Sequence, residues 1–174
     1  QTVAANRILW AVDHGLDSCK AAKLIPRRLI GDGDSAAADT WHWAEALHIP
    51  IEKFSPKKDY TDTQLALSFL KKEQISPFVL LTGALGARLD HTFSTLLSFG
   101  FSGLPGAIAD EQESCFFLHN QETLQFSIKK RPKAISLLSL SSSCQGVSIT
   151  NMYWPLQNAT IQQGFPAEIS NELL

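Results

Sequence analysis

Apolar and polar residues alternate in two different ways along the chain, and the change falls near residue 110. Before it, short apolar runs typical of buried strands alternate with stretches whose apolar residues recur every three to four positions, as in helices. After it, the helical period disappears, and short strand-like runs are separated by polar turns. The pattern predicts an N-terminal, mainly parallel α/β sheet domain over residues 1–110, followed by a C-terminal antiparallel β-sandwich over residues 111–174.

The predicted elements follow from these runs. In the first part we expect strands at 8–12, 28–30, 51–54 and 78–81. The helices expected between them cover 16–22, a segment capped by Asp39 or Thr40 that ends before Pro50, a segment opened by the capping-box pattern Thr61-Asp62-Thr63-Gln64, and 91–99. In the second part the strand candidates are 115–118, 123–128, 134–140 and 147–150.

Composition narrows the classes of protein that fit. Of the 174 residues 44% are hydrophobic, which is enough for a real core, and the net charge of -2 argues against a nucleic-acid partner. Cys19, Cys115 and Cys144 lack Cys-x-x-Cys spacing, which favours reduced thiols in a cytoplasmic protein over a zinc site. The longest apolar runs are shorter than the ~20 residues that span a bilayer, so we expect no membrane segment. We expect no secretory leader. Because the chain begins at Gln1 rather than Met, we expect an incomplete N-terminus.

The loops after the predicted strands carry most of the chemistry. The second of them, Gly31-Asp32-Gly33-Asp34-Ser35, holds two carboxylates in a flexible turn. In a parallel sheet the four loops would gather at one edge. That edge would hold Lys58, Arg88, a glycine-containing loop at 82–86 and the aspartates Asp13, Asp32, Asp34, Asp59, Asp62 and Asp90. Carboxylates suit Mg²⁺, while glycine amides and cationic side chains suit phosphate, so the mixture predicts a metal–polyphosphate site.

Each of these features also has a simpler explanation when it is taken alone. Asp-Gly-Asp-Ser is a common solvated turn, and Asp62 at a helix start is favourable for the helix dipole. Gly83 to Gly86 is not a Walker A motif, since no Gly-Lys-Ser/Thr follows. The functional hypothesis therefore depends on the coincidence of the loops.

The loop motifs, taken in order, resemble the thiamine pyrophosphokinase family. The residues that carry the resemblance are Asp13-x-Gly15, Gly31-Asp32-x-Asp34-Ser35, Lys58-Asp59-x-Thr61-Asp62-Thr63 and Thr82-Gly83-Ala84-Leu85-Gly86-x-Arg88-Leu89-Asp90-His91. Residues 135–137, 153–156 and 169–172 are similar to that family's β-sandwich domain. The resemblance covers nearly the whole chain.

The resemblance implies transfer of a diphosphate from ATP to thiamine, giving thiamine diphosphate and AMP, by a Mg²⁺-dependent homodimer. It implies that the α/β domain binds ATP and that the β-sandwich helps to bind thiamine. It assigns catalysis to Asp32, Asp34, Asp62 and Arg88, and the metal to Asp32, Asp34, Asp59 and Asp62, with Asp13 close by. It assigns ATP to Lys58, Thr61, Thr82, Gly83, Leu85, Gly86, Arg88, Asp90 and His91, and thiamine to Trp154, Ser170 and Asn171.

Three loop positions depart from the family pattern. His14 and Ala87 each stand where the family usually has glycine, and Gly33 stands where it usually has a bulkier residue. Two alternatives stay open, and the departures bear on the second of them. One is a pyrophosphokinase that acts on another small alcohol, and the other is a non-catalytic sensor of thiamine or a nucleotide.

Overall fold

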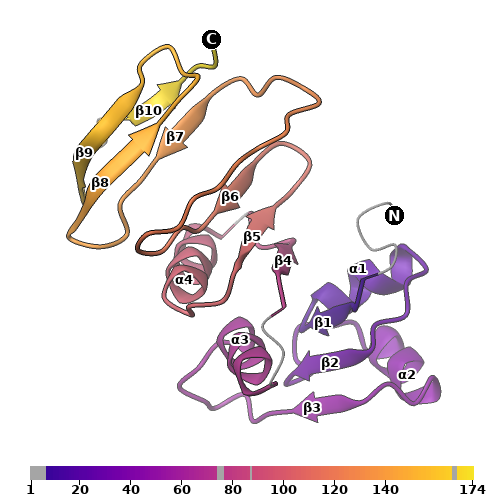
Figure 1. Ribbon diagram of the computed structural model, residues 1–174. Coiled ribbons are helices and arrows are strands. Elements are labelled where there is room, and N and C mark those ends of the chain that lie inside the picture. Colours follow the sequence, from indigo (N-terminus) through magenta and orange to yellow (C-terminus); the bar gives the residue numbers. More distant parts are fainter. Residues whose placement is uncertain (1–6, 74–76, 87, 166–167) are drawn as a thin grey trace. The chain divides into compact units, whose positions relative to one another are not determined.

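The computed structural model describes residues 7–73, 77–86, 88–165 and 168–174 and divides into two compact units, Gln1–Phe117 and Leu118–Leu174 (Figure 1). The fold class is confirmed, since helices and mainly parallel strands make up the first unit and antiparallel strands the second. The predicted domain boundary after residue 110 lies ahead of β6 (Ser114–Phe116), which the structure pairs with a strand of the first unit.

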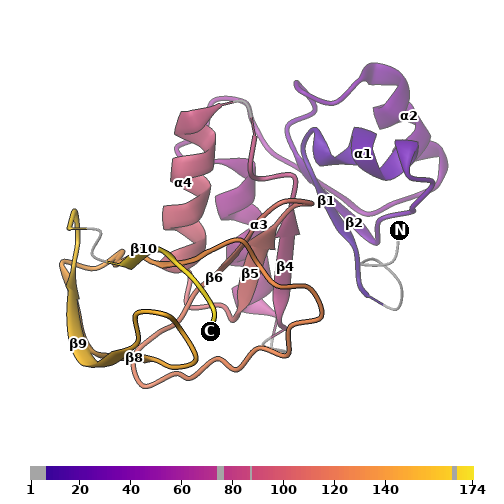
Figure 2. The same cartoon turned by 90° about the horizontal axis from the view of Figure 1, so that it is seen from above.

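The first unit begins with a three-stranded parallel sheet. Its strands are β1 (Trp10–Val12), β2 (Arg28–Gly31) and β3 (Ile51–Lys53), in that order. Helix α1 (Gly15–Ala21) packs against β1 and against α2 (Ala38–Ala46) (Figure 2). The core between them is made by the apolar side chains of Ala11, Leu16, Cys19, Leu29, Ala36, Trp41, Ala44 and Ile49.

The rest of the first unit contains a second three-stranded sheet. Its strands are β4 (Val79–Thr82) and β5 (Gly106–Ala109), which are parallel, and the antiparallel β6. Helices α3 (Asp62–Lys72) and α4 (Leu89–Gly100) lie side by side, as Figure 2 shows. The buried centre of this part is formed by Leu67 of α3, Phe99 of α4, Ile108 of β5, and Leu104, which precedes β5.

Strand β5 was not predicted, because its sequence Gly-Ala-Ile-Ala lacks a strong apolar or alternating run. It is nevertheless buried along most of its length. A Cβ at Gly106 would lie 2.1 Å from the backbone oxygen of Val79 and 2.7 Å from Cζ of Phe99. The close approach of β4 and α4 therefore requires glycine at this position.

Two predicted helix starts have different outcomes. The capping box of α3 is confirmed: Thr61 Oγ1 accepts from the Gln64 amide at 3.2 Å, and Gln64 Oε1 accepts from the Thr61 amide at 2.9 Å. For α2 the prediction of Asp39 or Thr40 as the cap was wrong, since Ala37 precedes the helix. Asp39 instead accepts a hydrogen bond from Lys20 Nζ at 2.7 Å, and this contact joins α2 to α1.

The second unit contains two antiparallel pairs of strands (Figure 1). Strand β7 (Ile135–Leu137) pairs with β10 (Glu168–Asn171), and β8 (Ser143–Ile149) pairs with β9 (Leu156–Gln162). The predicted strand at 123–128 was wrong, because these residues are exposed and lie outside every strand of the described chain. None of the described helices combines the length and the apolar character needed to cross a bilayer.

Candidate active site

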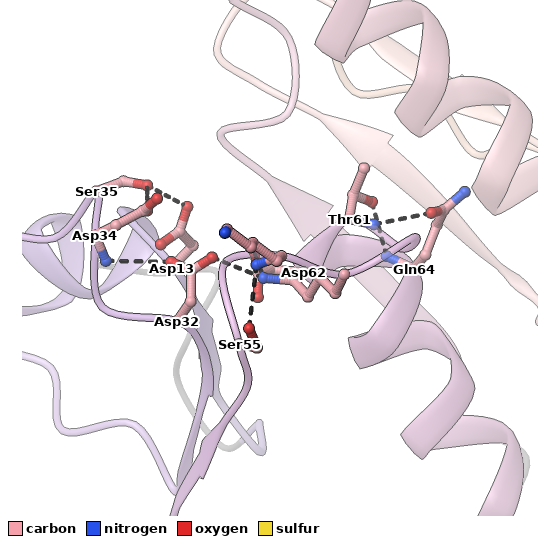
Figure 3. Close-up of polar contacts among 10 residues, drawn as sticks. Asp13, Asp32, Asp34, Ser35, Ser55, Thr61, Asp62 and Gln64 are labelled. Carbon is pink, nitrogen blue, oxygen red and sulfur yellow. Dashed lines mark hydrogen bonds and ion pairs between the residues drawn. The ribbon is translucent and has the colours of Figure 1, made fainter.

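Three carboxylates from distant parts of the chain meet in the first unit. Asp13 follows β1, Asp32 follows β2, and Asp62 is the first residue of α3 (Figure 3). One oxygen of each lies within 4.8 Å of the others. We call these residues the carboxylate cluster. The sequence predicted their convergence, because the carboxyl ends of parallel strands lie at one edge of a sheet.

The backbone of β1 and β2 explains how two of the carboxylates come so close. The Asp13 amide donates to the Ile30 carbonyl oxygen at 2.8 Å and so extends the contact beyond β1. A Cβ at Gly31 would lie 3.2 Å from Cα of Asp13, which is tighter than ordinary van der Waals contact. Glycine at position 31 thus lets the loop after β1 lie directly on the end of β2.

Lys58 bridges two members of the carboxylate cluster. Its Nζ lies 2.7 Å from Asp32 Oδ2 and 3.2 Å from Asp62 Oδ2. The exposed fractions of the three side chains are only 15% for Lys58, 8% for Asp32 and 14% for Asp62, so water screens the pairs weakly. The hydrogen bond from Lys58 lowers the pKa of Asp32 to about 2. Burial raises the pKa of Asp62 despite the same lysine, so the two carboxylates differ in basicity.

The carboxylate cluster fits a hard divalent cation. Asp13 Oδ1 and Asp62 Oδ1 are buried and have no hydrogen-bond partner among the described residues. Buried acceptors without a partner are costly, and a cation relieves that cost. Mg²⁺ takes oxygen ligands at about 2.1 Å, so opposite ligands lie about 4 Å apart, comparable with the spacing seen here. All three side chains offer carboxylate oxygens, and oxygen is the ligand atom that Mg²⁺ takes.

Asp34 and Asp59, which the resemblance also assigns to the metal, are exposed and are not members of the carboxylate cluster. The Asp34 amide donates to Asp32 Oδ1 at 3.1 Å, and the Ser35 hydroxyl lies 2.7 Å from both Asp34 Oδ1 and Asp13 Oδ2 (Figure 3). Asp34 is therefore linked to the carboxylate cluster through Ser35. Its role as a metal ligand, like that of Asp59, stays a prediction.

The turn between Asp32 and Asp34 depends on Gly33. Gly33 has a φ of +83°, a left-handed conformation that breaks the alternation of side chains expected for an extended segment. A Cβ there would also lie 3.3 Å from the indole ring of Trp41. Trp41 of α2 is buried and thus fills the space beside this turn. A bulkier residue at this position would require the indole to shift by a few tenths of an ångström.

We expect Gly33→Ala to lower the free energy of unfolding by about 1–2 kcal/mol, because an L side chain is strained in the left-handed region. Chemical denaturation of the purified variant measures the change. Gly15→Ala is the matched control, since a Cβ at Gly15 meets nothing within 4 Å. Equal stability of the Gly33→Ala variant and the parent would contradict the left-handed conformation assigned to Gly33.

A pocket of about 320 Å³ lies between the starts of α3 and α4. It is lined by the polar residues Thr61, Thr63, Asp90, His91, Ser94 and Thr95. Thr61, Asp90 and His91 were predicted to bind ATP. Asp62 lies between two pocket residues and belongs to the carboxylate cluster, so the start of α3 takes part in both.

The other predicted nucleotide-binding residues do not line this pocket. Thr82, Gly83, Leu85 and Gly86 lie in or after β4, and Ala87 is outside the described residues. Arg88 is exposed and donates to both carboxylate oxygens of Asp90, with Nε at 3.2 Å and Nη2 at 2.6 Å. Sequence reasoning missed Thr63, Ser94 and Thr95. Helical spacing from His91 could have found the last two, because residues three and four apart share a face.

In the second unit, the predicted thiamine-binding residues have different surroundings. Trp154 is 57% exposed and makes an edge contact with Tyr153, with ring centroids 4.9 Å apart. Asn171 is 3% exposed, and its amide binds the Trp154 backbone: Oδ1 accepts from the amide at 3.1 Å and Nδ2 donates to the carbonyl at 2.6 Å. Ser170 is exposed. Asn171 is thus a positioning residue for Trp154.

We expect Asn171→Ala to lower the free energy of unfolding by about 1–3 kcal/mol, because the Trp154 backbone groups lose buried partners. Chemical denaturation followed by tryptophan fluorescence measures the loss. Asn120→Ala, at an exposed turn, serves as a control that removes the same side chain. If both variants unfolded at the parental midpoint, the two hydrogen bonds would not contribute to stability.

Comparison with models of known protein families shows which family the chain matches. Residues 1–100 match the model for the catalytic domain of thiamin pyrophosphokinase, and residues 123–174 match the model for its vitamin B1 binding domain. The chain belongs to the thiamin pyrophosphokinase family. The two matches fall on the two compact units, so the first unit carries the family's catalytic part and the second its vitamin-binding part.

Similar proteins include thiamine pyrophosphokinases from a bacterium and a plant. The Bacillus subtilis (strain 168) protein is 28% identical over 171 residues, which cover 95% of this chain and 78% of the relative. Thiamine pyrophosphokinase 1 of Oryza sativa subsp. japonica is 24% identical over 154 residues, which cover 84% of this chain and 58% of the relative. The resemblance inferred from the loop motifs is confirmed.

Solved structures of family members have the same fold. The Bacillus subtilis thiamine pyrophosphokinase superposes with a TM-score of 0.80 at 26% identity, over 99% of this chain and 82% of that one. The enzyme from Geobacillus thermodenitrificans gives a TM-score of 0.80 at 27% identity, over 98% and 79%. The Candida albicans thiamin pyrophosphokinase, at 14% identity and a TM-score of 0.67, supports the fold alone, over 96% and 76%.

Proposed function

We propose that this protein transfers a diphosphate from ATP to the hydroxyl group of thiamine, giving thiamine diphosphate and AMP. The observation that carries the proposal is the convergence of the carboxylate cluster and Lys58 in a chain that matches both parts of the family. Neither a non-catalytic sensor nor a pyrophosphokinase for another alcohol is favoured by a specific observation.

We assign ATP to the part up to residue 110 and thiamine to the part after it. Asp32 and Asp62, with Asp13 beside them, would hold Mg²⁺, and Asp34 and Asp59 are further candidates. A bound Mg²⁺ would offset the negative charge of the polyphosphate. Thr61, Asp90 and His91 line the pocket and carry groups that can form hydrogen bonds with the nucleotide. Lys58 and Arg88 would stabilise the charge that spreads over the phosphates during transfer.

In the proposed reaction the thiamine hydroxyl oxygen attacks the β-phosphorus of ATP in line with the bond to the α-phosphate oxygen. The new oxygen–phosphorus bond forms as that bond breaks, and AMP leaves with the electron pair. The hydroxyl proton passes to a carboxylate. Asp62 is the candidate base, through a carboxylate oxygen that does not hold the cation, because burial raises the pKa of its carboxyl whereas Lys58 lowers that of Asp32.

The thiamine ring system would stack on Trp154. The thiazolium is cationic, and a tryptophan face attracts cations by about 1–2 kcal/mol when both are desolvated. The ring of Trp154 is exposed, and the backbone of the same residue is hydrogen-bonded by the Asn171 side chain. This arrangement supports the assignment of Trp154 to thiamine, with Ser170, which directly precedes Asn171 in the sequence, as a further candidate.

We also propose that the protein acts as a homodimer in the cytoplasm. The second unit exposes several large apolar side chains, among them Leu138, Phe165 and Ile169. Large apolar side chains that are exposed in one chain can be covered by a second chain. The three cysteines of the described chain form no disulfide, which is consistent with a reducing compartment.

The test is to incubate the purified protein with thiamine, ATP and Mg²⁺ and to identify the products by mass. We expect thiamine diphosphate and AMP in equal amounts. ADP with thiamine monophosphate would mean transfer of a single phosphate. Release of AMP only with another alcohol from a test panel would identify a different pyrophosphokinase. Tight thiamine binding without AMP would indicate a sensor.

A further inference from the structure

We propose that Lys58 is a built-in counter-ion of the carboxylate cluster, which disfavours a free divalent cation and makes cation binding depend on the nucleotide. The inference rests on the proposed function for the identity of the nucleotide. It concerns a property of Lys58 that is separate from charge stabilisation during transfer. Its basis is the position of one ammonium group among carboxylates that also suit a metal ion.

The first step is competition of two cations for the same carboxylate groups. Lys58 Nζ forms ion pairs with Oδ2 of Asp32 at 2.7 Å and with Oδ2 of Asp62 at 3.2 Å. The oxygens of Asp13 and Asp62 that lack a partner, both Oδ1, are buried in the same cluster (Figure 3). A divalent cation that joined all three carboxylates would lie close to the ammonium group. The metal ion and the ammonium group would then repel each other, and water would weaken this repulsion little because the groups are largely buried.

The second step is what a nucleotide changes. The phosphates of ATP bring several negative oxygens, and an ammonium group can donate three hydrogen bonds. Lys58 could then exchange carboxylate oxygens for phosphate oxygens, which would free Asp32 and Asp62 for the cation. Because binding linkage is reciprocal, a nucleotide that relieves this repulsion strengthens cation binding, and the cation strengthens nucleotide binding by the same factor.

The experiment compares cation affinity without and with nucleotide in two lysine variants. Lys58→Met removes the ammonium from the cluster, whereas Lys57→Met removes a charge from the adjacent, exposed residue. The affinity for Mn²⁺ is measured by electron paramagnetic resonance, first with the protein alone and then with a saturating non-hydrolysable ATP analogue. Lys58→Arg, which keeps the charge, separates loss of charge from loss of packing.

Without nucleotide, we expect Lys58→Met to bind Mn²⁺ on the order of ten-fold more tightly than the parent, because removing a nearby like charge shifts ionic equilibria by at least that factor. Lys57→Met and Lys58→Arg should bind Mn²⁺ like the parent. With the analogue present, the advantage of Lys58→Met should disappear. Equal or weaker Mn²⁺ binding by Lys58→Met without nucleotide, including no binding by either protein, overturns the proposal.

These outcomes are independent of turnover. A parent protein that fails to make thiamine diphosphate would refute the proposed function, while tighter Mn²⁺ binding by Lys58→Met would still support the counter-ion role. Thermal unfolding of each variant shows whether it is folded. If Lys58→Met does not fold, Lys58→Gln replaces it as the neutral variant, with the same expected gain in Mn²⁺ affinity and the same contradicting result.

Discussion

Asp32→Asn should reduce the rate of thiamine diphosphate formation by about 10²–10³-fold, because removal of one well-placed charged or polar group from a reacting site typically costs that much. Asn has nearly the same size as Asp but loses the charge that faces Lys58 at 2.7 Å and the oxygen that would face a metal ion. The measurement is kcat at saturating thiamine and Mg-ATP.

Asp39→Asn is the matched control for this change. Asp39 is an exposed aspartate of α2 that pairs with Lys20, outside the carboxylate cluster. The Asp39→Asn variant should keep the parental kcat within about two-fold, because exposed ion pairs contribute little to the stability of the fold. Parental turnover by Asp32→Asn would show that the carboxylate cluster has no part in catalysis. A comparable loss in Asp39→Asn would point to a general effect of charge.

Trp154→Ala should raise KM for thiamine about ten-fold and leave KM for ATP unchanged. Loss of cation–π attraction of about 1.4 kcal/mol corresponds to that factor. Steady-state kinetics with each substrate varied in turn separates the two constants. Trp154→Phe should retain part of the thiamine affinity, because a smaller aromatic face remains.

Tyr153→Ala tests whether any aromatic loss in this region has the same effect. Tyr153 is exposed and touches the Trp154 ring edge to face. Its removal should change KM for thiamine less than the removal of Trp154. Equal losses for both substrates in Trp154→Ala would indicate a folding defect, and an unchanged KM for thiamine would refute the stacking assignment.

The sequence predicted best those features that depend on neighbouring residues. Thr61 and Gln64 form a capping box, because both partners lie within one helical turn. The convergence of Asp13, Asp32 and Asp62 was also accessible, because it follows from the alternation of strands and helices. Asp13 was placed near the metal in the sequence analysis but not among its ligands, although it directly follows the first strand.

Features that depend on distant packing could not be predicted. Strand β5 carries few large apolar residues, and only its neighbours Val79 and Phe99 show why Gly106 is required. The direction of Asp34 depends on the φ of Gly33, which the sequence does not specify. The apolar residues of 123–128 alternate as in a strand, yet pairing requires a neighbouring strand that the pattern cannot supply.

The contact between Trp41 and Gly33 has a consequence for exchanging segments between relatives. Positions 33 and 41 form one steric unit, so an acidic turn transplanted from a relative with a bulky central residue would meet the indole of the recipient. A chimaera would need a smaller residue at position 41 together with the new turn. The two positions should therefore be exchanged together.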